Sequence, residues 1–178
     1  MATNKHWGLL AEYNTPAELY QACEEIRDAG FQKWDAHTPF PVHGLDKAMG
    51  LPLSFLPWLV LVVGLSGTAS AVALQYYVHS IAYTLVISGK PFFALPAYVP
   101  IIFELSILFS AGAAVFGMLA INRLPMWNHP LFTSRRFERV TDDRFFISIE
   151  SSDPKFDGAA THDLLSGTGA SHVEYVEA

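Results

Sequence analysis

The chain has 178 residues and a formal net charge of −6, with 51% hydrophobic and 16% charged residues, whereas ordinary soluble domains have roughly 25% charged residues. The acidic balance argues against a nucleic-acid partner, because such proteins present a basic surface to phosphate. Between Leu51 and Asn122 the only Asp, Glu, Lys or Arg residues are Lys90 and Glu104. This distribution predicts a membrane protein.

Residues 1–50 predict a strand, a helix and a second strand, without a cleavable signal peptide. The alternating positions of the first strand are Trp7, Leu9 and Ala11. Thr15 and Glu18 form a capping box around Pro16, so a helix starts there. Its apolar stripe is Leu19, Cys23 and Ile26. Gly30 ends the helix, and residues 31–36 form the second strand.

Residues 51–124 predict a transmembrane hairpin with spans at about 55–77 and 100–121. Each span is long enough to cross a hydrocarbon core of about 30 Å, and in lipid the backbone must satisfy its own hydrogen bonds as a helix. Pro57 and Pro100 are expected in the first turns of the two helices, where a missing N–H costs little. Residues 89–100, with three prolines, are expected to form an ordered, non-helical loop.

Basic residues lie on both flanks of the hairpin rather than in its connecting loop. Lys33 and Lys47 precede the first span, Lys90 alone lies between the spans, and five arginines follow the second: Arg123, Arg135, Arg136, Arg139 and Arg144. Because basic flanks stay in the cytoplasm, we expect both termini inside and the short loop 78–99 outside.

Residues 125–178 repeat the strand–helix–strand plan of the N-terminal part. Phe145–Ile149 has strong strand composition, Asp157 is a helix cap, and residues 172–176 alternate as a last strand. Neither half can bury a sheet face alone. Together they predict an α/β (α+β) fold, in which one ferredoxin-like βαβ–βαβ domain is split at its midpoint by the hairpin.

Small residues recur at helical spacing in both predicted spans. They are Gly64, Gly67 and Ala71 in the first, and Ser106, Ser110, Ala113 and Gly117 in the second. Small residues let helices approach closely, so both sets are candidate helix-packing faces. Two helices offer only one mutual contact, and we therefore expect further faces to meet other subunits.

Glu104 is the candidate functional residue within the spans. An ionisable group in a spanning helix is costly, and such groups mark proton paths or polar contacts between subunits. The alternative is a structural Glu near the interface that reaches toward the headgroups. The basic segment 135–139 is expected at the cytoplasmic surface, where it meets anionic lipids or a partner.

Motifs for chemistry within this chain are absent from the sequence. The single cysteine, Cys23, excludes an internal disulfide, a CxxC pair and a CxxCH haem attachment. The histidines lack metal-ligand spacing, and no nucleophile, dinucleotide or phosphate-loop motif is found. We therefore expect no cofactor, no metal, no catalytic residue and no activity of the chain alone.

Four segments around the hairpin carry a family resemblance: Pro41–Leu51, Asn128–Phe132, Phe137–Ile147 and Asp153–Asp157. In this order they resemble the D subunit (ActD) of bacterial alternative complex III, over essentially the whole chain. The resemblance implies a non-catalytic accessory subunit of a quinol-oxidising respiratory complex in the bacterial inner membrane. Its implied partners are lipids, polytopic quinol-binding subunits, and multihaem cytochrome and iron–sulfur subunits, which carry the haem c and the clusters.

Two other functions remain open on the residues alone. One is a membrane-anchored sensor whose soluble domain binds a small ligand. The other is a small homo-oligomeric transporter, since two spans and one intramembrane carboxylate could support transport.

Overall fold

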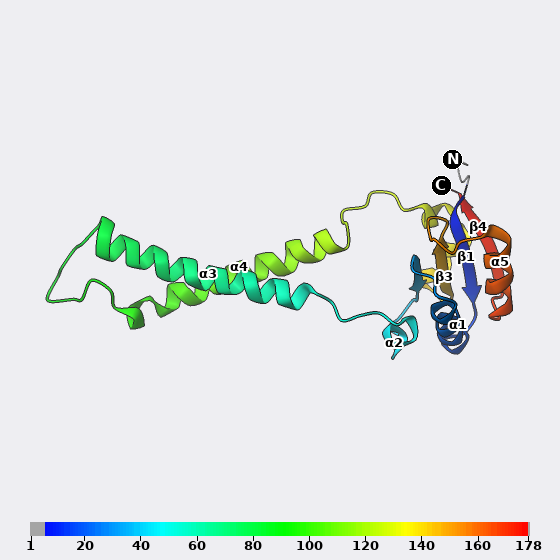
Figure 1. Cartoon of the computed structure of the whole chain (residues 1–178), viewed down its shortest axis with the longest axis horizontal. Coiled ribbons are helices and arrows are strands. Elements are labelled where there is room, and N and C mark those ends of the chain that lie inside the picture. The colour runs from blue at the N-terminus through cyan, green and yellow to red at the C-terminus, as the bar shows by residue number, and fades with distance from the viewer. Residues whose placement is uncertain (1–5, 178) are drawn as a thin grey trace. The chain divides into compact units, whose positions relative to one another are not determined.

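The computed structural model describes residues 6–177, which divide into two compact units (Figure 1). The soluble unit joins Met1–Pro52 with Trp127–Ala178, and the hairpin unit is Leu53–Met126. The protein is thus a mixed α/β chain with one four-stranded antiparallel sheet and two long apolar helices.

The sheet has the order β2-β3-β1-β4, and every neighbouring pair is antiparallel. Its strands are β1 (His6–Tyr13), β2 (Trp34–His37), β3 (Phe145–Glu150) and β4 (His172–Glu177). The two central strands, β1 and β3, come from opposite sides of the hairpin in the sequence. Their register pairs Leu9 with Ile149 and Ala11 with Ile147.

Helices α1 (Pro16–Ala29) and α5 (Gly158–Gly167) cover one face of the sheet. The predicted capping box is confirmed, because Thr15 Oγ1 accepts from Glu18 N at 3.2 Å while the Glu18 carboxylate accepts from Thr15 N at 3.3 Å. The predicted Asp157 cap is also confirmed by a bond from Ala160 N at 3.0 Å. Buried residues of this face include Leu9, Ala11, Leu19, Cys23, Ile26, Ile147, Ile149 and Leu165.

The opposite face of the sheet, here called the outer face, is also covered. Two short 3₁₀ helices, η2 (Pro130–Thr133) and η3 (Arg136–Thr141), bring Leu131 and Phe137 against it. The same cluster contains Leu10, Phe146 and Val176, with Trp7 packed against it. The predicted alternation is therefore wrong at Trp7, which packs on the outer face while Leu9 faces the helices. A register irregularity between His6 and Gly8 accounts for this, because a bulge changes the face on which the next residue lies.

The second strand begins later than predicted, at Trp34 instead of residue 31. The backbone N–H groups of Gln32 and Lys33 donate to Asp153 Oδ2, each at 2.6 Å, and not to a neighbouring strand. After β2 a five-residue helix, α2 (Leu45–Met49), lies between Gly44 and Gly50, which have φ values of 80° and 69°. These glycines provide the left-handed turns that other residues rarely adopt.

The hairpin unit contains α3 (Leu56–Tyr77), which continues into the π-helix η1 (Val78–Ala82), and α4 (Leu95–Ile121). The predicted limits agree with α3. The predicted start of the second helix at Pro100 is wrong, because the helix begins at Leu95 and Pro96 occupies its first turn. Pro100 lies inside α4 and leaves the Pro96 carbonyl without its usual helical donor. Residues 95–100, expected as loop, are helical.

Asp153 joins the two sequence halves of the soluble unit. Its carboxylate accepts backbone hydrogen bonds from Gln32, Lys33 and Lys155. Burial opposes ionisation and raises the pKa of Asp153, but these three bonds outweigh burial and hold the pKa below its ordinary value. The ionised carboxylate therefore stabilises the folded state at neutral pH.

We expect Asp153→Ala to lower the free energy of unfolding by about 1.5–3 kcal/mol at pH 7, as for hydrogen bonds to a charged group. Urea denaturation of the purified chain, followed by circular dichroism, measures this loss. Because the folded-state pKa is depressed, the wild-type advantage is present above about pH 3.9 and is lost as the pH falls through the folded-state pKa. Asp142→Ala removes an exposed carboxylate and is the control. An equal loss in both variants would contradict this role.

Candidate functional site

Helices α3 and α4 contact each other through the small residues of the first predicted set. Gly64, Gly67 and Ala71 are buried. A Cβ added to Gly64 would lie 2.3 Å from Ser110 Oγ, and one added to Gly67 would lie 2.8 Å from the Leu105 carbonyl oxygen. At Gly67 the backbones of the two helices therefore lie against each other, with no room for a larger side chain.

The second predicted set lies on the same contact. Thr68 Oγ1 and Ser106 Oγ share a hydrogen bond of 2.6 Å between the helices. Ser110 Oγ donates to the Ser106 carbonyl at 2.8 Å, so its hydroxyl is satisfied within α4. Gly117 is buried beside Leu56 and Leu59, and Ala113 is half-buried. The structure thus brings both sets of small residues to the contact within the hairpin.

A second group of polar contacts lies near the loop end of the hairpin. Tyr98 is 4% exposed, the His79 ring stacks on it at 5.0 Å, and Lys90 Nζ lies 5.8 Å from the ring centroid. The Gln75 side chain donates to the Tyr98 carbonyl at 3.4 Å. These contacts tie the end of α3, the loop and the start of α4 together.

Glu104 is the tenth residue of α4, and its side chain is exposed on the hairpin. It forms none of the ion pairs or side-chain hydrogen bonds found among residues 6–177. The prediction placed it one turn inside the helix, but the earlier start at Leu95 puts it roughly 13 Å along the helix axis at 1.5 Å per residue. Glu104 thus lies deeper in the helix than expected.

Two apolar grooves follow the surface of the hairpin. One, of about 520 Å³, is lined by Leu59, Val63, Phe109, Gly112, Ala113, Phe116 and Gly117. The other, of about 400 Å³, runs past Gly64, Thr68, Ser106 and Ser110 among aliphatic side chains. Large apolar side chains are exposed along both helices, among them Phe103, Leu108 and Phe116. Such a continuous apolar surface is typical of contact with lipid or a partner.

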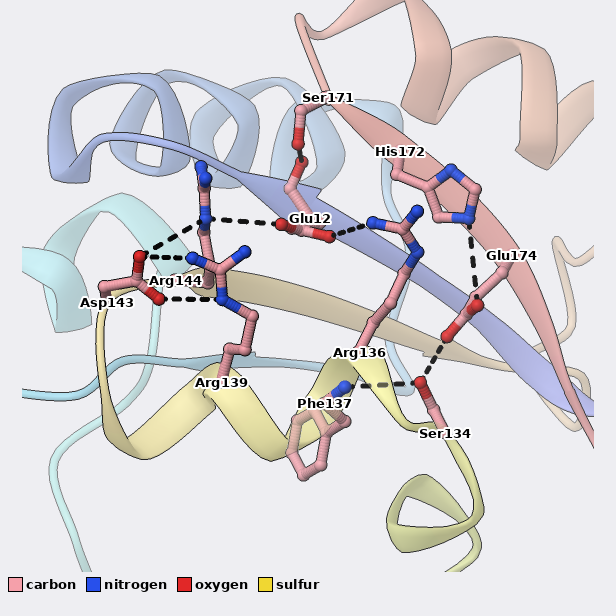
Figure 2. Close-up of polar contacts among 10 residues, drawn as sticks. All are labelled: Glu12, Ser134, Arg136, Phe137, Arg139, Asp143, Arg144, Ser171, His172 and Glu174. Carbon is pink, nitrogen blue, oxygen red and sulfur yellow. Dashed lines mark hydrogen bonds and ion pairs between the residues drawn. The ribbon is translucent and has the colours of Figure 1, made fainter.

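A buried carboxylate organises the outer face of the sheet (Figure 2). The Glu12 side chain is 6% exposed, and Arg136 Nη1 donates to its Oε2 at 3.0 Å. Arg144 Nε lies 3.4 Å from the other Glu12 oxygen. The sequence analysis did not predict these ion pairs of Glu12. The available indications were a Glu within a predicted strand and several arginines after the second span.

The remaining polar residues of Figure 2 pair within the same unit. Arg139 binds Asp143 through two hydrogen bonds, one of them 2.9 Å long. Ser134 Oγ donates to the Glu174 carboxylate, which lies 3.7 Å from His172 Nε2. In the basic segment expected to meet lipid or a partner, Arg136 and Arg139 form internal ion pairs, and both of them, like Arg135, remain exposed.

A hollow of about 340 Å³ opens on the outer face beside β2 and β3. Its lining residues are Trp7, Gln32, Lys33, Trp34, Asp35, His37, His129, Leu131, Ser148 and Glu150. His37 Nε2 and Ser148 Oγ share a hydrogen bond of 3.0 Å at this face. Burial lowers the pKa of His37, so its imidazole is neutral at pH 7. Sequence reasoning did not anticipate this hollow.

Cys23 is fully buried among apolar side chains of the helix-covered face. Burial raises the pKa of its thiol to about 12, so the thiolate is scarce at neutral pH. Within residues 6–177 no group of three or more His, Cys, Asp or Glu side chains could hold a metal ion.

Comparison with known proteins gives one family. The family model described as "Alternative complex III, ActD subunit" matches residues 7–175 of the chain. No curated protein gives a significant match. The match spans the soluble unit and the hairpin together.

We expect Gly67→Ala to destabilise the hairpin by about 1–3 kcal/mol, because the new methyl group meets the Leu105 carbonyl and Phe109 Cβ, each at 2.8 Å. Gly112→Ala is the matched control, since an added Cβ there meets nothing within 4 Å. Thermal unfolding of the detergent-purified chain, followed by helical circular dichroism, compares them. If the two variants melt alike, close approach at Gly67 does not hold the helices together.

Proposed function

The chain belongs to the ActD subunit family of alternative complex III, and from this we propose that it is a non-catalytic accessory subunit whose hairpin packs against polytopic quinol-binding subunits. The family match over both units carries the proposal. The complex conducts electron transport through other subunits, which hold its haem c and iron–sulfur clusters. This chain supplies surfaces that stabilise its polytopic neighbours.

We propose that α3 and α4 cross the bacterial inner membrane. Both are long and apolar enough to span a bilayer. Large apolar side chains are exposed along both helices, which is unfavourable in water over such a length. The ring contacts among Tyr76, Phe93 and Tyr98 suit the headgroup level at the loop end.

The soluble unit is proposed to be a ferredoxin-like domain on the cytoplasmic side. Strand order β2-β3-β1-β4, with one helix after β1 and one after β3, supports this topology. The sheet requires both sequence flanks of the hairpin on one side of the membrane. The arginines after α4 and the single Lys90 between the spans favour cytoplasmic termini and a periplasmic loop at residues 78–99.

Partner subunits are proposed to cover the outer surfaces of the hairpin rather than the small-residue contact. Gly64, Gly67 and Ser106 already face the other helix of the hairpin. The groove beside Gly112 and Phe116 and the apolar side chains around Glu104 are open. Helices associate in lipid through close packing and hydrogen bonds, so these surfaces suit partner helices.

Glu104 is proposed to make a polar contact with a partner helix, with a minor part in proton transfer as the competing role. Its exposed carboxylate roughly 13 Å along α4 would be costly against lipid. A hydrogen-bond donor from another subunit would remove that cost.

Purification of the tagged chain in mild detergent tests the proposed assembly. We expect it to bring down subunits that contain haem c and iron–sulfur clusters, visible by absorption spectroscopy and mass spectrometry. The matched control is a tagged, unrelated inner-membrane protein prepared in the same way. Isolation of a colourless homo-oligomer would contradict the proposal and favour a transporter.

Substitution of Glu104 separates its two roles. We expect Glu104→Gln to leave assembly and quinol oxidation unchanged, because the amide still forms hydrogen bonds. Glu104→Leu should weaken assembly by about 1–2 kcal/mol, the range found for polar contacts between membrane helices. Glu25→Leu makes the same change at an exposed position of α1, outside the hairpin, and is the control that should leave assembly unchanged. Reduced turnover in an intact Glu104→Gln complex would instead establish proton transfer.

A further inference from the structure

The hollow beside β2 and β3 combines an aromatic wall with carboxylates. Trp7 packs against the outer-face cluster, and its ring meets the His129 ring edge-to-face at 5.2 Å. Asp35 on β2 and Glu150 on β3 line the same space. The hollow lies within the soluble unit and is lined by none of the ion-paired residues around Glu12.

The two carboxylates have local hydrogen bonds but no cation. Asp35 Oδ1 accepts from the Ala36 backbone N–H at 2.8 Å, and the Glu150 carboxylate accepts from Ser152 Oγ at 2.7 Å. Neither belongs to the ion pairs found among residues 6–177. Lys33 Nζ also binds Ser152, at 3.2 Å, and His37 is neutral at pH 7. The hollow therefore carries a net charge of about −1 from Asp35, Glu150 and Lys33.

This lining fits a guanidinium group. A planar guanidinium stacks on an indole ring and donates several hydrogen bonds to carboxylates at the same time, which an ammonium group cannot do. A volume of about 340 Å³ is at the small end for ligand pockets, roughly 300–1,000 Å³. It accommodates one long side chain rather than a secondary-structure element.

The charge of the whole soluble unit favours a basic protein surface as the source of that group. The chain carries −6, and the hairpin contributes +1 through Lys90, Arg123 and Glu104, so the soluble unit carries −7. Polytopic membrane proteins concentrate Lys and Arg in their cytoplasmic loops. A cytoplasmic soluble unit of this charge is complementary to such loops.

We propose that the hollow beside β2 and β3 receives an arginine side chain from a cytoplasmic loop of a polytopic partner subunit. The proposal rests on the proposed function, which supplies the partner and the cytoplasmic location. Trp7 stacks on the guanidinium, and Asp35 and Glu150 accept its hydrogen bonds.

Photo-crosslinking in the assembled complex tests the occupant. A photo-reactive amino acid replaces Gln32, which is exposed and uncharged and lines the hollow. The same replacement at Glu25, an exposed position on α1, is the control because α1 covers the opposite face of the sheet. After irradiation, mass spectrometry is expected to find an arginine-containing cytoplasmic peptide of another membrane subunit joined to position 32 and not to position 25.

Charge removal gives a second readout. The double variant Asp35→Asn and Glu150→Gln keeps the local hydrogen-bond acceptors and is expected to reduce crosslinking from position 32 roughly tenfold, equivalent to about 1.4 kcal/mol. Glu24→Gln with Glu25→Gln removes the same charge from α1 and should leave the yield unchanged. Circular dichroism of both purified variants checks that the chain is folded.

The outcomes separate this inference from the proposed function. If the complex co-purifies but position 32 joins only lipid, a second copy of this chain, a soluble protein or a loop without arginine, the inference is wrong and the accessory role stands. An unchanged yield in the folded Asp35→Asn, Glu150→Gln variant also overturns it. If the chain purifies alone, the proposed function fails first and the inference fails with it.

Discussion

The antiparallel ladder between β1 and β3 is the constraint on which the rest of the chain depends. It pairs Gly8–Tyr13 with Phe145–Glu150, across a connection that includes the entire hairpin. Each of the three ladders joins a strand that precedes the hairpin to one that follows it, so the sheet exists only when both halves meet. Closing so long a connection costs little more than closing a short one, because the entropy grows only with the logarithm of length. Both ends of the hairpin must therefore return to one soluble unit.

Polar groups on both faces of the sheet reinforce this closure. Asp153 fixes the chain just before β2 through two backbone N–H groups at 2.6 Å. On the outer face, Glu12 of the first half binds Arg136 and Arg144 of the second. A nearly buried carboxylate is costly without a cation, so β1 and the segment after α4 depend on each other. Arg136 and Arg144, whose position after α4 favours a cytoplasmic location for the C-terminal flank, thus also stabilise β1 through Glu12.

Local signals predicted local structure well. The capping box at Thr15, the Asp157 cap and the left-handed Gly30 act within one turn of helix, and each lies where the sequence placed it. The predictions were wrong where contacts between residues distant in sequence determine the local structure. Gln32 and Lys33 leave the second strand because Asp153, distant in sequence, takes their N–H groups, and a bulge turns Trp7 to the outer face. Pro100 was read as a helix start, but Pro96 fills that position one turn earlier.

For the hairpin, the sequence predicted which residues are important but not which of them contact each other. Sequence periodicity grouped the small residues of each span on one face, but it could not show that the two faces meet each other. Because Gly67 already lies against the Leu105 carbonyl, the small-residue faces are used within the hairpin. A partner therefore meets what remains, which is the apolar surface around Glu104 and the groove beside Gly112. In the proposed membrane location, that surface offers close packing and one carboxylate, whereas the soluble unit, at −7, offers charge. The proposed partner subunit therefore needs two different features: helices that match the grooves, and basic loops that complement the charge of the soluble unit.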